Sequence, residues 1–129
     1  MAEDAVVRGD GGDDMESMND ILGEVNESLK LLGEMYPEQM KAFGSFMRSA
    51  EKGGALPHKT KELISIALSI ATHCKWCIAY HVKNALAAGA TEEEIMETCF
   101  VAALMGGGPS LMYTQLVVKA LEDLNGESR

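Results

Sequence analysis

The sequence has few aromatic residues, few cysteines and few basic residues. Aromatic residues make up only 5% of the 129 residues, whereas nine residues are methionine. This balance predicts an aliphatic and partly adaptable core. Three cysteines are too few for the disulfide framework of a small secreted domain. We therefore expect a protein of a reducing compartment, the cytoplasm.

Basic charge is scarce as well, because 20 acidic residues stand against 11 lysines and arginines and leave a net charge of −9. Nucleic acids and anionic membranes are bound through basic surfaces, so we expect neither as a partner. No apolar run approaches the roughly 18 to 20 residues that cross a bilayer. The first residues also lack the basic and then apolar pattern of a secretion signal.

The length is sufficient for one domain and too short for two ordinary ones. Residues 1–14 are rich in glycine and aspartate and show no periodicity, which predicts a disordered acidic tail before a single domain at 15–129. From residue 15 onward, apolar residues recur at three- and four-residue spacing, and no alternating strand pattern is present. The expected fold is all-α, a compact bundle of about six helices. They are expected to begin near residues 15, 37, 57, 74, 91 and 110.

Two of the three cysteines form the motif Cys74-Lys-Trp-Cys77, and His81 follows four residues later. On a regular helix these three side chains fall within an arc of about 60°, and His81 lies about 6 Å along the axis from Cys77 but about 10 Å from Cys74. A histidine at this distance can accept the thiol proton of Cys77 and so generate the reactive thiolate. The start of the helix also favours a thiolate through its free N–H groups.

Each candidate residue also has a structural interpretation. The C-x-x-C pair is compatible with redox chemistry, metal binding or a plain core. Glu62, on the preceding helix, could orient His81, or it could be a solvated charge between Lys59 and Lys61. Cys99 lies among apolar residues and is expected to be a buried, inert thiol. His58 follows a proline at a helix start and is expected at the surface.

Over residues 35–122 the chain resembles the carboxymuconolactone decarboxylase superfamily, and within it the AhpD-like alkylhydroperoxidase branch. The resemblance rests on the spacing Glu62-x11-Cys74-x2-Cys77-x3-His81, on LAAGATEEEI at 86–95 and on GGGP at 106–109. The combination is specific, although no single part of it is. One position differs, because Trp76 occurs where the best-studied branch has a second histidine. The proton network of this chain is therefore simpler or differently tuned.

The resemblance implies an all-helical trimer or hexamer that reduces peroxides without a metal or an organic cofactor. It assigns Cys77 as the peroxide-attacking thiol, Cys74 as the resolving thiol, His81 as the proton relay and Glu62 as its base. The resulting disulfide would be reduced by a dithiol protein, such as a lipoyl domain or a thioredoxin-like protein. The sequence thus predicts a peroxiredoxin-type alkylhydroperoxidase, a thiol-dependent peroxidase or disulfide oxidoreductase.

Two other functions remain open on the sequence. The superfamily name suggests a decarboxylase or related lactone-acting enzyme, although that chemistry needs no dithiol. A non-catalytic zinc-binding module could use Cys74, Cys77, His81 and Glu62 as its four ligands. However, three of these residues share one helix face, whereas zinc sites usually draw ligands from two separated elements.

Overall fold

The computed structural model describes residues 16–124, which form six helices and contain no strand. The all-α prediction is therefore confirmed. The acidic tail predicted for residues 1–14 lies outside the described residues. The helices are α2 (Met18–Met35), α3 (Pro37–Glu51), α4 (His58–Ala71), α5 (Lys75–Ala87), α6 (Glu92–Gly106) and α7 (Gly108–Leu124).

Local sequence signals explain where several helices begin. Pro37 occupies the first turn of α3, where its missing N–H is not needed. Thr91 and Glu94 form a complete capping box at the start of α6, with each side chain accepting from the other's backbone N–H. Gly107, at a φ of 76°, ends α6 in a backbone conformation that suits glycine. Because this turn needs only one residue, α7 begins at Gly108, two residues before the predicted start.

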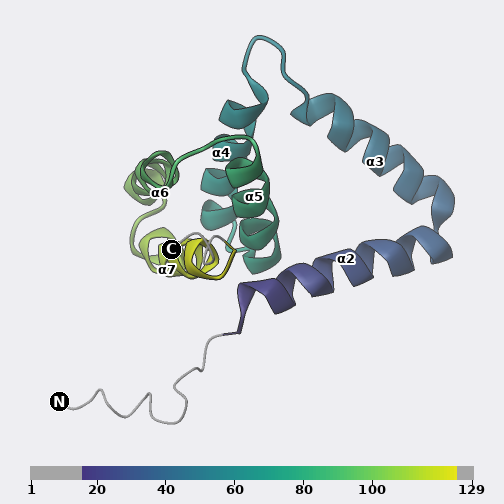
Figure 1. Ribbon diagram of the computed structural model, residues 1–129, viewed down its shortest axis with the longest axis horizontal. Helices are drawn as coiled ribbons and strands as arrows, with labels where there is room; N and C mark the ends of the chain where they lie inside the picture. Colours follow the sequence, from purple (N-terminus) through teal and green to yellow (C-terminus); the bar gives the residue numbers. More distant parts are fainter. Residues whose placement is uncertain (1–15, 125–129) are drawn as a thin grey trace.

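The helices α4 to α7 pack around a common apolar core, which the first half of α2 also joins (Figure 1). The rest of α2 and all of α3 extend away from this bundle as an arm, and α3 has no buried residue. Fully buried core side chains come from five helices: Met18, Ile21, Ile66, Ile70, Ile78, Val82, Ile95 and Val117. Within residues 16–124, no helix combines the length and apolar character needed to cross a bilayer.

A tight turn joins α4 to α5 and sets the position of the cysteine motif. His73 adopts a φ of 59°, which is uncommon for a residue with a side chain. The N–H of Cys74 then donates to the carbonyl of Ser69 at 3.0 Å. Cys74 itself is extended and serves as the N-cap of α5, so the helix begins one residue later than predicted. This turn presents both cysteines at the N-terminal end of α5.

Candidate active site

The packing of α4 against α5 brings Glu62 and His81 into direct contact. His81 Nδ1 lies 2.8 Å from Glu62 Oε1. Glu62 is only 1% exposed and His81 is 17% exposed. Because an ionised carboxylate can only accept, the imidazole donates through Nδ1, which leaves Nε2 to accept a proton. The contact that the sequence could only suggest is therefore present.

Cys74 and Cys77 form a disulfide at the N-terminal end of α5. The N–H of Cys77 donates to Cys74 Sγ at 3.2 Å, so the Cys74 sulfur caps the helix. Positive partial charge at this helix end stabilises negative charge on sulfur, as in other C-x-x-C sites. The third cysteine takes no part in this pair. Cys99 is completely buried, and burial raises its pKa to about 11 although the Thr114 hydroxyl partly opposes the shift.

A cavity of about 390 Å³ lies beside the cysteine pair, and both Cys77 and His81 line it. Thiol and imidazole therefore face one shared space, whereas Cys74 does not line it. The remaining wall is mostly apolar and comes mainly from α2, α3 and α5, with Glu51 and Ser65 as polar members; its larger apolar residues are Val25, Leu29, Phe43, Phe46, Met47 and Trp76. Such a space suits a ligand that has an apolar body and a reactive group near Cys77.

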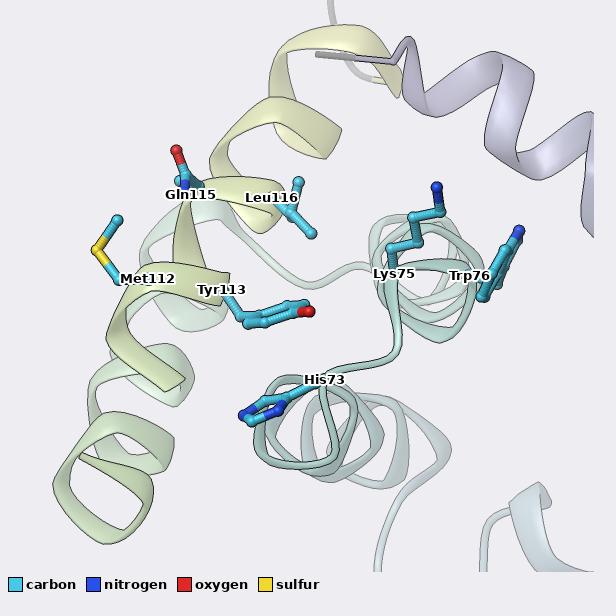
Figure 2. A pocket seen from close by; sticks show the side chains of 7 residues that line it. All are labelled: His73, Lys75, Trp76, Met112, Tyr113, Gln115 and Leu116. Carbon is cyan, nitrogen blue, oxygen red and sulfur yellow. The ribbon is translucent and has the colours of Figure 1, made fainter. Parts of the chain in front are cut away.

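A second cavity, of about 460 Å³, lies near the start of α5 and against α7 (Figure 2). His73 and Lys75, the two neighbours of Cys74, line it together with Tyr113. The rings of His73 and Tyr113 stack with centroids 4.7 Å apart. Trp76 lines both cavities and so stands between them. The cysteine pair is thus flanked by one space on the Cys77 side and by another on the Cys74 side.

Acidic side chains from α2 and from the residues just before it contact the two residues between the cysteines. Trp76 Nε1 donates to Glu24 Oε1 at 2.8 Å, and Lys75 forms an ion pair with Glu16. The hydrogen bond and charge of Glu16 raise the pKa of Lys75. Lys75 Nζ also lies 5.0 Å from the centre of the Trp76 ring. These contacts hold Trp76, the side chain that lies between the two cavities.

Sequence reasoning missed two residues near Glu62. His58 is half-exposed as expected, yet its Nε2 lies 3.6 Å from Glu62 Oε2. Glu51, at the end of α3, has its carboxylate within 4.8 Å of ligand atoms of Glu62 and His81. The four-residue spacing from His58 to Glu62 could have indicated their proximity. Nothing in the local sequence marks Glu51, which reaches the site only through the path of α3.

The comparisons with known proteins agree on one family. The model of the carboxymuconolactone decarboxylase family matches residues 37–120. An uncharacterised protein of Cupriavidus necator is 36% identical over 104 residues, which is 81% of this chain and 92% of that protein. Another from Paracoccus denitrificans, named for its place in the cox locus, is 39% identical over 85 residues, 66% of this chain and 77% of that protein.

Two solved structures have the same fold. A carboxymuconolactone decarboxylase family protein of Legionella pneumophila is 39% identical, with a TM-score of 0.78 over 89% of this chain and 100% of its own. A family protein of Thermotoga maritima is 28% identical, with a TM-score of 0.75 over 83% of this chain and 92% of its own. A possible role in an antioxidative response has been named for the Thermotoga protein.

Proposed function

Since this chain belongs to the carboxymuconolactone decarboxylase family and carries a Cys74–Cys77 pair beside a Glu62–His81 pair, we propose that it is a thiol-dependent peroxidase. One observation carries the proposal: Cys77 and His81 line the same cavity, and the buried Glu62 carboxylate supports the imidazole from behind. Lactone chemistry would leave the cysteine pair without a role. A zinc module that used both cysteines would need three ligands from one short stretch of α5 and its N-cap, whereas the Cys74–Cys77 disulfide shows that the two sulfurs can pair with each other, as the peroxidase cycle requires.

The proposed cycle begins with the reduced pair. His81 accepts the thiol proton of Cys77, and Glu62 stabilises the imidazolium that forms. The Cys77 thiolate attacks the outer oxygen of a hydroperoxide, so the O–O bond breaks and the sulfur becomes a sulfenic acid. The alkoxide that leaves takes the proton from His81 and departs as an alcohol. The peroxide has then gained two electrons from the sulfur.

Cys74 completes the oxidative half of the cycle. Its thiol loses its proton as the sulfur attacks Cys77 Sγ, the S–OH bond breaks, and the hydroxide takes that proton and leaves as water. A dithiol protein, such as a lipoyl domain or a thioredoxin-like protein, then reduces the disulfide by exchange and becomes a disulfide itself. Attack at Cys74 is favoured because its neighbours His73 and Lys75 line the second cavity, away from the peroxide space.

The largely apolar wall of the first cavity favours organic hydroperoxides over hydrogen peroxide. The test is consumption of cumene hydroperoxide and hydrogen peroxide by the reduced protein, first with dithiothreitol and then with a reduced lipoyl domain. We expect turnover with dithiothreitol and a higher kcat/KM for cumene hydroperoxide. Cys77→Ser should be inactive, and Cys99→Ala should retain activity. A fully reduced wild-type protein that consumes neither peroxide would refute the proposal.

A further inference from the structure

Three side chains of the types that bind metal ions meet behind the cysteine pair. Glu51 at the end of α3, Glu62 on α4 and His81 on α5 each offer one ligand atom, and these atoms all lie within 4.8 Å of one another. Glu62 is buried, while Glu51 and His81 are partly buried. The three helices that supply them are separated in sequence. This arrangement therefore draws its ligands from distinct elements, as metal sites in proteins commonly do.

Two carboxylates, of Glu51 and Glu62, meet at this point, and the imidazoles of His58 and His81 lie beside Glu62. Glu62 Oε2 is buried and has no hydrogen-bond partner. Its nearest cationic candidate, His58 Nε2, lies 3.6 Å away, which is too long for a hydrogen bond. A buried carboxylate oxygen without a partner is costly, and a cation placed between Glu62 and Glu51 would remove that cost.

Nearby lysine does not supply that cation. Lys61 Nζ donates instead to the backbone carbonyls of Ala50 and Lys52, at 2.9 and 2.7 Å. His58 Nδ1 lies 2.8 Å from the carbonyl oxygen of Glu51. These contacts from α4 hold the end of α3 against the site. Within residues 16–124, the Glu51 carboxylate itself forms no hydrogen bond or ion pair. Its backbone is thus fixed while its charge remains available.

We propose that Glu51, Glu62 and His81 form a binding site for a divalent zinc ion. Two carboxylate oxygens and one imidazole nitrogen suit zinc, whereas magnesium and calcium prefer oxygen ligands alone. Two positive charges would neutralise the two carboxylates. Three protein ligands leave a fourth position for water. This site does not use Cys74 or Cys77, so it is available in the disulfide form.

Zinc at this site would act as an inhibitor, a consequence that rests on the proposed function. A His81 ring whose free lone pair is bound to zinc cannot accept the proton of Cys77. The ion would thus hold the oxidised protein in a form that cannot restart its cycle after reduction. Zinc binding itself does not depend on peroxide chemistry, so the two proposals can fail separately.

The experiment is equilibrium dialysis of the disulfide form against zinc, in a buffer without other ligands. Titration of free thiols first shows that Cys74 and Cys77 remain bonded. We expect one zinc per chain, and at least roughly tenfold weaker binding by Glu51→Gln. Glu38→Gln, an exposed position in the first turn of the same helix, is the matched control and should bind zinc as the wild type does.

A second measurement identifies the ligands. X-ray absorption of the zinc-loaded disulfide form should show only nitrogen and oxygen neighbours, at about 2.0 to 2.2 Å, and no sulfur at about 2.3 Å. Three results would overturn the proposal: no zinc bound by the disulfide form, equal binding by wild type and Glu51→Gln, or sulfur in the coordination shell. None of these results would bear on peroxide consumption.

Discussion

Replacing Glu62 by glutamine tests the relay at its most buried member. Glutamine has nearly the same shape and can still accept a hydrogen bond from His81 Nδ1. In the wild type this nitrogen lies 2.8 Å from Glu62 Oε1. It removes the negative charge that stabilises the imidazolium. A hydrogen bond to a charged group contributes about 1.5 to 3 kcal/mol and a neutral one about 0.5 to 1.5 kcal/mol, so the loss of about 1 to 1.5 kcal/mol corresponds to a roughly 5- to 12-fold slower reaction of Cys77 with peroxide.

The same substitution should hardly change stability. Glu62 Oε2 has no hydrogen-bond partner in its buried position, so the wild-type carboxylate is not fully compensated. Replacing the carboxylate by an amide removes the buried charge. The free energy of unfolding, measured by urea unfolding, should therefore change by no more than about 1 kcal/mol. The predicted variant is therefore slow but stably folded. This combination distinguishes loss of the relay from loss of structure.

The assay is stopped-flow reaction of the prereduced protein with cumene hydroperoxide, followed by tryptophan fluorescence from Trp76. Glu97→Gln, an exposed change on α6, is the control and should react like the wild type. The deficit of Glu62→Gln should shrink as pH rises, because the Cys77 thiol then ionises without help from His81. A wild-type rate for Glu62→Gln at neutral pH would refute the relay.

Double substitution shows whether Glu62 and His81 act as one unit. If the carboxylate acts only through the imidazole, Glu62→Gln combined with His81→Ala should be no slower than His81→Ala alone. Losses that multiply would mean that each residue acts on the peroxide independently. That outcome would contradict the proposed order from Glu62 through His81 to Cys77.

Four further predictions concern the cysteines and the assembly. Cys74→Ser should complete one turnover and stop at a sulfenic acid on Cys77 that dimedone traps, whereas Cys77→Ser should not react; the reverse pattern would make Cys74 the nucleophile. With its pKa raised from 9.0 to about 11, Cys99 should carry about 100-fold less thiolate at pH 8 than an ordinary thiol, so native-state alkylation followed by mass mapping should leave it unlabelled. Because the thiol ionises at lower pH in the unfolded chain than in the folded one, the stabilisation that Cys99 provides is complete below pH 9 and is lost as pH rises through 11. The pH-dependent unfolding of Cys99→Ala should not show this loss. Light scattering should show a homo-oligomer, a trimer or hexamer, and a stable monomer at micromolar concentration would contradict this.

The helices were predictable because their signals are local. Apolar residues at helical spacing, the Thr91–Glu94 capping box and Pro37 each act over one or two turns, and the structure follows them. The shared cavity of Cys77 and His81 also follows from their one-turn separation on a single helix. Such features need no knowledge of how one helix packs against another.

The surroundings of Glu62 were less predictable because they depend on tertiary packing. The sequence offered Glu62, on the preceding helix, as a partner of His81 only as a possibility, and the packing of α4 against α5 decided it. Glu51 reaches the same point from the end of α3, after a loop whose path the sequence does not specify. The arm was not predictable either. Phe43 and Phe46 lie on an apolar helix pattern, yet they are 52% and 66% exposed in the single chain.

The two sulfurs of the pair are stabilised by different means, which explains how one motif can perform two steps. Cys77 shares its cavity with His81, so its proton can move to a base. Cys74 does not line the cavity of His81, but its sulfur accepts a hydrogen bond from the N–H of Cys77 at the start of α5. In the proposed cycle, reductant attack on Cys74 releases a Cys77 thiolate beside His81, and the proton that the attacking thiol of the reductant gives up would reach that thiolate through His81. In the proposed cycle the same histidine would therefore serve both halves, first as base and then as acid. Trp76 borders both cavities and is held by Glu24, so it lies between that histidine and the side that we propose for the reductant.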